Sequence, residues 1–160
     1  MFVATTVETD FGPITIIAAA DGLREIVLPG GRRKTDLPIS AGEGQDRILG
    51  RAAQQIREFL AGQRRTFSLP LSMHGTSFQQ QVWKIIHAIP YGQTLSYGEI
   101  GEQLGSRNKA RAVGGAAHAN PLPLVIPCHR VIGSTGSLTG FAGGLPLKKR
   151  LLTLEGWLLP

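Results

Sequence analysis

The chain has 160 residues, a formal net charge of +6 and one cysteine, and its length allows one or two small domains with a real hydrophobic core. A single cysteine excludes an intramolecular disulfide and a cysteine-cluster zinc site, so we expect a reducing, cytoplasmic environment, with no metal and no cofactor. Neither a signal-peptide pattern nor an apolar run of about 18 residues occurs, which argues against a membrane partner.

Positive charge is concentrated in the second half of the chain. Residues 1–74 carry nine Lys and Arg against eight Asp and Glu, whereas residues 75–160 carry eight against three. This asymmetry favours a polyanionic partner. The alternative is that the basicity has no specific meaning, as in many soluble proteins.

Strands are the first elements that the sequence predicts. Ile14, Ile16 and Ala18 alternate with other residues before Asp21–Gly22, which is a strong signal for a hairpin turn. We expect the chain to return as a second strand over 23–28. This pattern predicts a small antiparallel sheet near the N-terminus.

An irregular segment and a helix are predicted after the strands. The segment from Arg32 to Gly44 is expected to be irregular and on the surface. Residues 45–61 show the spacing of an amphipathic helix that ends at Gly62, with apolar side chains at Ile48, Leu49, Ala52, Ile56, Phe59 and Leu60. Nothing in this part suggests catalysis, so we interpret it as a scaffold.

The next predicted helix covers residues 78–88, with Ser77 as its N-cap, and it is broken by Pro90–Tyr91–Gly92. A capping-box pattern of Ser96 and Glu99 then opens a helix that runs to about Leu104. The capping pattern and the proline-glycine break together predict two separate helices here.

A short turn over Gly105–Asn108 leads from the second of these helices to another over Lys109–His118. Two helices joined in this way form a helix-turn-helix. A last helix is predicted from leucines at helical spacing, with basic residues early and Glu155 near its end; the leucines are Leu147, Leu151, Leu154 and Leu158 and the basic residues Lys148, Lys149 and Arg150.

The helix predicted over 109–118 carries almost no side chain beyond Arg111, and Gly114 and Gly115 weaken it. Such a helix can bring its backbone very close to nucleic acid, in contact that depends little on base sequence. Equally, small residues permit tight packing against another helix inside the protein. This segment by itself leaves both interpretations open.

These elements predict a mixed α/β (α+β) fold with two domains. Residues 1–70 form a scaffold domain with a small sheet and a helix. A stretch rich in Leu, Pro, Ser and Gly predicts a linker at 71–77. Residues 78–160 form a mostly helical domain that contains the helix-turn-helix.

The one cysteine, Cys128, is the strongest candidate for chemistry. A lone cysteine is by default an inert, buried residue. Here His129 follows it and Arg130 comes next, and both favour a thiolate over a thiol. Pro127 fixes the backbone before it, at the point where an apolar run over 122–126 meets a polar loop. We therefore favour a functional cysteine over a structural one.

Adjacent cysteine and histidine limit the possible mechanisms. Neighbouring side chains on a strand point to opposite faces, so contact between Cys128 and His129 requires a turn or an intervening water. A histidine that serves a thiol also needs a carboxylate to hold its tautomer, and Glu155 is the only acid after the cysteine. A cysteine hydrolase would need oxyanion donors for which the sequence gives no independent sign.

The segment Asn120–Val131 resembles the active-site signature of the O6-alkylguanine-DNA alkyltransferases. The resemblance covers about residues 77–156 without a gap, while residues before it match only in general pattern. Its most specific part is Pro-Cys-His-Arg with an asparagine eight residues before the cysteine. It also includes Phe78–Trp83, Ile89–Gly92, Ser96–Ile100, Ala110–Gly114, Gly140–Gly144 and Leu151–Gly156.

The resemblance implies DNA repair by direct reversal. Cys128 would take the alkyl group from O6-alkylguanine, and from O4-alkylthymine, in one irreversible step per molecule. His129 would act as its base through a bound water and Glu155 would orient His129. Tyr97 would contact the flipped nucleotide and donate a proton to the departing guanine. Asn120 would buttress the turn that carries the cysteine.

The resemblance also implies that the protein is a monomer that binds double-stranded DNA and flips the damaged base out of the helix. Arg111 would fill the space that the base leaves, reaching it through the minor groove. Ser134 would contact the base or the DNA backbone. The other residues expected to contact DNA are Tyr97, Phe78, Gly98 and Ser106.

The chain departs from the family pattern at two positions of the glycine-rich loop. Several relatives carry tyrosine and serine where this chain has Phe141 and Ala142, so the preferred alkyl size stays open. The cysteines that hold a structural zinc in some relatives are absent.

Two other functions are weighed against alkyl transfer: a non-catalytic DNA-binding helix-turn-helix module, and a cysteine hydrolase.

Overall fold

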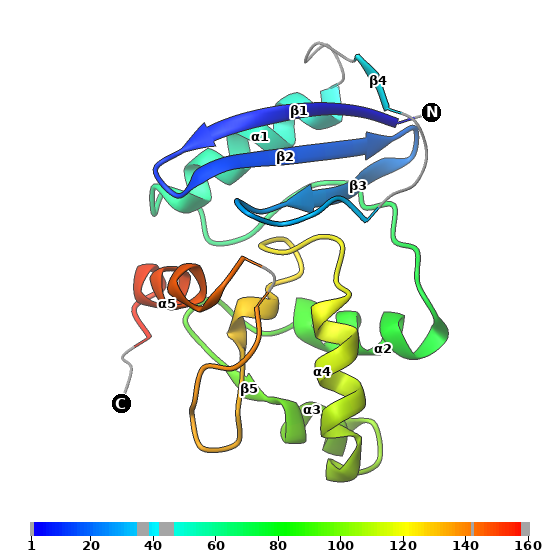
Figure 1. Cartoon of the computed structure of the whole chain (residues 1–160), viewed down its shortest axis with the longest axis vertical. Coiled ribbons are helices and arrows are strands. Elements are labelled where there is room, and N and C mark those ends of the chain that lie inside the picture. The colour runs from blue at the N-terminus through cyan, green and yellow to red at the C-terminus, as the bar shows by residue number, and fades with distance from the viewer. Residues whose placement is uncertain (1, 35–38, 42–46, 142, 158–160) are drawn as a thin grey trace. The chain divides into compact units, whose positions relative to one another are not determined.

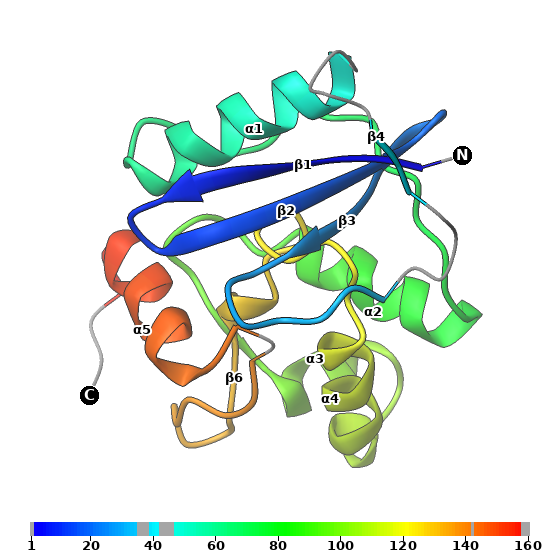
Figure 2. The ribbon, with the colours of Figure 1, turned by 45° about the horizontal axis from the view of Figure 1, so that its top comes forward.

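The computed structural model describes residues 2–34, 39–41, 47–141 and 143–157. The chain divides into two units, residues 1–73 and residues 74–160. In Figures 1 and 2 the first unit is a sheet with one helix, and the second is mostly helical. The mixed fold class predicted from the sequence is confirmed.

A four-stranded sheet forms the first unit, in the strand order β3–β2–β1–β4. The strands are β1 (Phe2–Thr9), β2 (Gly12–Ala19), β3 (Gly22–Val27) and β4 (Ile39–Ala41). The first three strands are antiparallel, and β4 pairs with β1 in parallel. The hairpin predicted at Asp21–Gly22 is confirmed, since β2 and β3 pair from Ala19 and Gly22 onward.

The prediction of an irregular segment from Arg32 to Gly44 is wrong at one place, because β4 lies within it. Three residues are too few to show the period-two alternation by which a strand is recognised, and the partner strand β1 supplies the hydrogen bonds that define it. Residues 35–38 and 42–44 of this segment lie outside the described part of the chain.

Helix α1 (Arg47–Leu60) covers one face of this sheet (Figures 1 and 2). The helix predicted over 45–61 is confirmed within the described residues, which exclude 45 and 46. The helix stops before Gly62, whose φ of 76° is the left-handed conformation that glycine adopts readily. Its apolar side chains face inward, and the buried ones are Leu49, Ala52, Ala53, Ile56 and Phe59.

The second unit contains most of the helices. They are α2 (Ser77–His87), α3 (Tyr97–Gln103), α4 (Ala110–His118) and α5 (Leu145–Leu154), with the short 3-10 helices η1 (Arg107–Lys109) and η2 (Cys128–Arg130). Two short parallel strands, β5 (Leu95–Ser96) and β6 (Val131–Ile132), connect the segment before α3 with the segment after Cys128. The segment that leads into α3, the first helix of the helix-turn-helix α3–α4, thus pairs with the segment that follows the cysteine.

The N-cap predicted for α2 is wrong by one residue. Thr76, not Ser77, caps the helix, and its side chain and that of Gln79 form a capping box. Both Thr76 and Ser77 are followed three residues later by a glutamine, so the sequence pattern fits either residue equally well. The capping box predicted for Ser96 and Glu99 at the start of α3 is confirmed.

Two further boundaries differ from the predictions. The turn predicted over Gly105–Asn108 continues into η1, so α4 begins at Ala110 and not at Lys109. The Ser106 hydroxyl accepts a hydrogen bond from the backbone N–H of Asn108, which explains the additional turn. Helix α5 ends at Leu154, before Gly156 with its φ of 82°.

The predicted Leu158 lies outside the described residues. Among the residues that the structure does describe, no helix has both the length and the apolar character needed to cross a lipid bilayer.

Candidate active site

Cys128 follows a tight turn at Pro127. With φ −77° and ψ 68°, Pro127 forms an inverse γ-turn in which the Cys128 N–H donates to the Ile126 carbonyl at 2.7 Å. The chain then turns through η2, so Cys128 and His129 do not alternate as they would on a strand. Cys128 is 8 % exposed. The nucleophile candidate therefore sits at a turn with limited access.

Asn120 holds the two ends of the loop that precedes this turn. Its Nδ2 donates to the Ile126 carbonyl at 2.8 Å, and its Oδ1 accepts from the Leu122 N–H at 2.9 Å. The Ile126 carbonyl thus accepts both from this side chain and from the backbone of Cys128. Within the loop, Leu124 has a φ of 77°, a conformation that costs a non-glycine residue about 1–3 kcal/mol. The strained residue is thus in the loop that leads into the cysteine turn.

A buried carboxylate joins the histidine and the arginine that follow Cys128. Glu155, at the end of α5, lies 2.6 Å from His129 Nε2 through its Oε2. Arg130 binds both oxygens of the same carboxylate, at 2.8 Å through Nε and at 3.0 Å through Nη2. The Gly92 N–H donates to Oε1 at 2.9 Å. Four hydrogen bonds therefore fix the position of this carboxylate.

Arg130 binds the Glu155 carboxylate. The sequence suggests that Arg130 promotes a thiolate directly, but its guanidinium is directed to Glu155 and, through Nη1 at 2.7 Å, to the Ile89 carbonyl. The Tyr91 ring lies 5.5 Å from the same guanidinium. Arg130 therefore acts on the site through Glu155.

The electrostatics of this cluster keep the carboxylate charged and the imidazole neutral. Burial by itself would raise the pKa of Glu155, but the hydrogen bonds from His129 and Arg130 outweigh burial and lower it to about 2. Burial lowers the pKa of His129, against the opposing effect of Glu155. A neutral His129 that donates from Nε2 to Glu155 carries its lone pair on Nδ1. The geometry thus makes Nδ1 the basic atom.

Lys148 and Tyr97 complete the surroundings of Cys128. The Lys148 side chain is fully buried, and its Nζ donates to the carbonyls of Val131 at 2.6 Å and Thr139 at 2.8 Å. The Tyr97 hydroxyl donates to the same Thr139 carbonyl at 3.3 Å. Burial lowers the pKa of Lys148 to about 8 and raises that of Tyr97; the charge of Cys128 opposes the first shift and adds to the second. Both side chains therefore lie within electrostatic reach of the sulfur.

Sequence reasoning missed Lys148, which it grouped with Lys149 and Arg150 as basic residues early in the last helix. The signal that could have identified it is helical periodicity. Position 148 precedes Leu151 and Leu152 by three and four residues, so it lies on the apolar stripe of α5. A lysine on a buried stripe needs a specific polar partner, which is itself a sign of function.

The loop between β6 and α5 lies over the histidine side of the site. The Phe141 ring meets the His129 ring edge-on, with 6.5 Å between the ring centroids. Ala142, the second departure from the family pattern, lies outside the described residues. Ser134 is exposed in the first part of this loop, where the Gly133 N–H donates to the Ser137 carbonyl at 2.8 Å.

Helix α4 has one packed face and one open face. Val113, Ala116 and Ala117 are buried, so small residues do permit close packing within the protein. Arg111 and Gly115, however, are exposed, and a Cβ added at Gly115 would meet no atom within 4 Å. The packing interpretation of this helix is thus confirmed for one face, and contact with nucleic acid stays a prediction for the open face. Nothing in the described residues requires a glycine at 115.

The remaining residues predicted to bind DNA lie at the starts of helices. Ser106 caps η1, and Gly98 lies in the first turn of α3, where an added Cβ would come within 3.1 Å of Arg107 Nη1. Phe78 is half-buried at the start of α2. The structure joins His129 to Glu155 directly after Cys128 and places Tyr97 within electrostatic reach of the sulfur. Arg111 and Ser106 lie on α4 and at the cap of η1.

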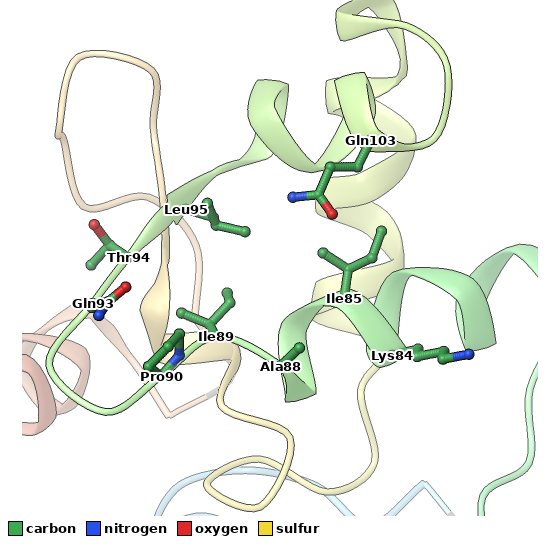
Figure 3. Close-up of a pocket in the computed structure, with 9 residues that line it drawn as sticks. All are labelled: Lys84, Ile85, Ala88, Ile89, Pro90, Gln93, Thr94, Leu95 and Gln103. Atoms are coloured by element: carbon green, nitrogen blue, oxygen red, sulfur yellow. The ribbon is translucent and has the colours of Figure 1, made fainter.

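A cavity of about 370 Å³ lies elsewhere in this unit, between the end of α2 and α3. Figure 3 shows Ile85, Ile89 and Leu95 around it, with the Gln103 amide facing in from α3. No predicted site residue lines this cavity. The candidate site at Cys128 is therefore separate from this cavity. The described residues also contain no group of three His, Cys, Asp or Glu side chains that could hold a metal ion.

The fold and site describe a protein that combines a helix-turn-helix with a buried cysteine, histidine and glutamate. Two family models match this chain: "6-O-methylguanine DNA methyltransferase, ribonuclease-like domain" over residues 2–73, and "6-O-methylguanine DNA methyltransferase, DNA binding domain" over residues 77–157. The chain therefore belongs to the 6-O-methylguanine DNA methyltransferase family.

Individual relatives agree with this assignment. The methylated-DNA–protein-cysteine methyltransferase of Methanosarcina acetivorans is 40% identical over 149 residues, which cover 93% of this chain and 95% of the relative. The constitutive enzyme of that name from Bacillus subtilis is 51% identical over 108 residues, 67% of this chain and 66% of the relative. The crystal structure of Mycobacterium tuberculosis OGT in complex with DNA has 38% identity and a TM-score of 0.86, covering 96% of this chain and 93% of that one.

Proposed function

We propose that this protein repairs DNA by moving an alkyl group from the O6 atom of guanine to the sulfur of Cys128. The observation that carries the proposal is the buried His129–Glu155 pair, which fixes a neutral imidazole immediately after the one cysteine. Its relatives are named as methyltransferases of methylated DNA that use a protein cysteine. The same chemistry applies to O4-alkylthymine, which also carries its alkyl group on an exocyclic oxygen.

The reaction balances with the cysteine and the damaged base alone, so it needs no metal or cofactor. The thiol proton passes to His129 Nδ1 through a water molecule, and the sulfur attacks the alkyl carbon in line with the carbon–O6 bond. The carbon–sulfur bond forms as the carbon–O6 bond breaks, and its electron pair stays with the guanine. The thioether has no good leaving group, so each molecule reacts once.

The neighbouring residues act in different ways in this mechanism. Glu155 stays ionised throughout, since Arg130 and Gly92 hold it, and it stabilises the imidazolium that forms when His129 accepts the proton. Tyr97 contacts the flipped nucleotide and gives the departing guanine a proton. Lys148 stabilises the negative charge on Cys128 through space. Asn120 buttresses the turn that carries the cysteine.

A base within the duplex cannot present its O6 substituent to a buried sulfur, so it must be flipped out, at a cost of a few kcal/mol. Arg111 fills the space that the base leaves, and the open face of α4 lets the backbone approach the minor groove. Ser134, Phe78, Gly98 and Ser106 contact the DNA around the lesion. One copy of the chain acts on one lesion in the cytoplasm.

Intact-mass measurement tests this proposal directly. After mixing with duplex DNA that contains O6-methylguanine, the protein should gain the mass of one CH₂ group, located on Cys128 by peptide mapping. The Cys128→Ser variant should bind the same DNA without any gain. Methyl transfer by Cys128→Ala would rule out this nucleophile, and binding without transfer by the wild type would indicate a non-catalytic binding module. Repeated turnover of an ester would instead indicate a hydrolase.

A further inference from the structure

The indole of Trp83 connects α2 to the end of α4. Trp83 is 3 % exposed, and its Nε1–H donates to the Ala116 carbonyl at 2.8 Å in a buried hydrogen bond. The contact joins residues 33 positions apart in the chain. It is therefore a tertiary contact that acts on a helix whose other end carries Arg111.

The Ala116 carbonyl is one of the last four in α4, and the last four carbonyls of a helix have no N–H partner within the helix. Its regular partner would be the N–H of Asn120, four residues on. That N–H donates instead to the Ala117 carbonyl at 3.2 Å, and the Ala119 N–H donates to Gly115 at 3.0 Å. The indole N–H supplies the bond that a further helical turn would have supplied. Trp83 is thus a side-chain cap for the C-terminal end of α4.

The position of the indole is itself constrained. A Cβ added at Gly75 would lie 2.4 Å from the Cη2 atom of Trp83, so the ring is packed directly against this glycine. The Ala116 carbonyl is on one side of the indole and the backbone before α2 is on the other. The ring therefore has little freedom to shift without moving α4.

Trp83 lies at the junction of the DNA-facing helix and the cysteine turn. The chain leaves α4 at His118 and reaches Asn120 two residues later, and Asn120 binds the same Ile126 carbonyl as the Cys128 backbone. Arg111 is near the start of α4, and the nucleophile follows its end. A displacement of α4 along its axis would therefore change the separation between Arg111 and Cys128.

We propose that Trp83 is a positioning residue that sets this separation, so that Arg111 can occupy the duplex while the flipped base reaches Cys128. The inference rests on the proposed function. A duplex substrate requires both ends of α4 in register, whereas a free base requires only the pocket around the sulfur. That pocket is held by the hydrogen bonds of Asn120 to Ile126 and Leu122 and by that of Glu155 to His129, whereas the indole N–H of Trp83 binds the Ala116 carbonyl.

The test compares Trp83→Phe with the wild type on two substrates, O6-methylguanine in duplex DNA and free O6-benzylguanine. We expect the rate of methyl transfer from duplex to fall at least tenfold, and the rate with the free base to fall less than threefold. Gly75→Ala, which displaces the indole but keeps its N–H, should show the same selectivity for duplex. Ile86→Val on the same helix is the matched control for lost core packing and should slow both reactions equally.

Thermal unfolding of each variant identifies those that are simply less stable. Equal loss on duplex and free base in both Trp83→Phe and Gly75→Ala would overturn the inference, as would a wild-type rate on duplex. Should Trp83→Phe fail to fold, replacement of the indole by the isosteric 3-benzothienyl ring removes only the N–H and tests the same point. A wild-type protein that transfers no methyl group would instead contradict the proposed function.

Discussion

The two units contain matching features that serve different ends. Helix α1 has an exposed glycine, Gly50, and an exposed arginine, Arg51, just as α4 has Gly115 and Arg111. Yet α1 buries leucine, isoleucine and phenylalanine against a sheet, whereas α4 buries only valine and alanine. A helix that packs so little apolar surface gains little from burial. We therefore expect the outer face of α4, and not that of α1, to bind a partner.

Ion pairs show the same contrast. Glu58 and Arg64 in the first unit lie 2.8 Å apart, with more than a quarter of each side chain exposed. Glu155 and Arg130 are at the same distance, but the Glu155 side chain is fully buried. Exposed pairs contribute about 0–1 kcal/mol, whereas removal of one partner from a buried pair leaves an uncompensated charge. Matched variants in the two units can therefore separate function from ordinary surface chemistry.

The largest effect should come from replacing Arg111, which is compared with Arg51 in α1. Arg111→Ala should slow methyl transfer from duplex DNA by on the order of a hundredfold. Without a side chain in the space that the base leaves, the flipped state loses a few kcal/mol relative to the stacked state. Its rate on free O6-benzylguanine should change less than twofold. Arg51→Ala in α1 is the control and should change neither rate. Equal losses on both substrates would contradict the role of Arg111 in the duplex.

Acid unfolding should distinguish the two ion pairs. The pKa of Glu155 is lowered in the folded state from its ordinary 4.5 to about 2, so its contribution is complete above pH 4.5 and is lost as the pH falls towards 2. Glu155→Gln should remove on the order of 2 kcal/mol of stability at neutral pH and flatten the decline in this range. Denaturant titrations across these pH values measure it. Arg64 also lowers the pKa of Glu58, but this pair is exposed, so Glu58→Gln should change the profile much less than Glu155→Gln. A steep decline in Glu155→Gln would count against the assignment.

Proton transfer from Cys128 to His129, with Glu155 holding the imidazole, should contribute about tenfold to the rate. His129→Ala and Glu155→Gln should slow alkylation of Cys128 by at least this factor, the low end for a general base acting on a good nucleophile. Raising the pH should partly restore both rates, since hydroxide then supplies the thiolate. Rate measurements from about pH 6 to 10 check this against the ordinary thiol pKa of about 8.5. A Glu155→Gln variant with wild-type rates throughout would make Glu155 purely structural.

The glycines should give the smallest effect. A Cβ at Gly50 or at Gly115 meets no atom of the described residues within 4 Å, so alanine at either position should stabilise its helix by about 0.5–1 kcal/mol. Only Gly115→Ala should weaken binding to duplex DNA, by about fivefold, because the added methyl group separates α4 from the groove. Unfolding and DNA titrations at fixed salt measure both. Unchanged affinity in Gly115→Ala would leave that glycine unexplained.

The predicted turns and helix caps depend on local sequence patterns. The hairpin at Asp21–Gly22 and the capping box at Ser96 and Glu99 depend on residues within four positions of each other, so the sequence displays them. The turn at Pro127 is similarly local. Strand β4 could not be predicted in this way, because it exists through its pairing with β1, more than thirty residues earlier in the chain.

The candidate site was predictable where residue chemistry is distinctive and not where it depends on packing. A single cysteine beside a histidine, with a single acid downstream, predicted the pairing of His129 with Glu155, which the structure confirms at 2.6 Å. The reaction of Cys128 stays a prediction. Lys148 and the attachment of Arg130 to Glu155 depend on which faces of α5 and η2 turn inward. The proposed role of Trp83 likewise depends on its hydrogen bond to a carbonyl at the end of α4, which no sequence pattern predicts.

The two donors on the Ile126 carbonyl have a consequence for motion. The Cys128 amide proton and the Asn120 side chain share this acceptor inside the protein, so neither can be released to water while the turn stays closed. Isotope exchange at the Cys128 amide therefore follows the rare opening of the whole turn and not the fluctuations of its surface. The exchange rate of the Cys128 amide thus measures how often this turn opens.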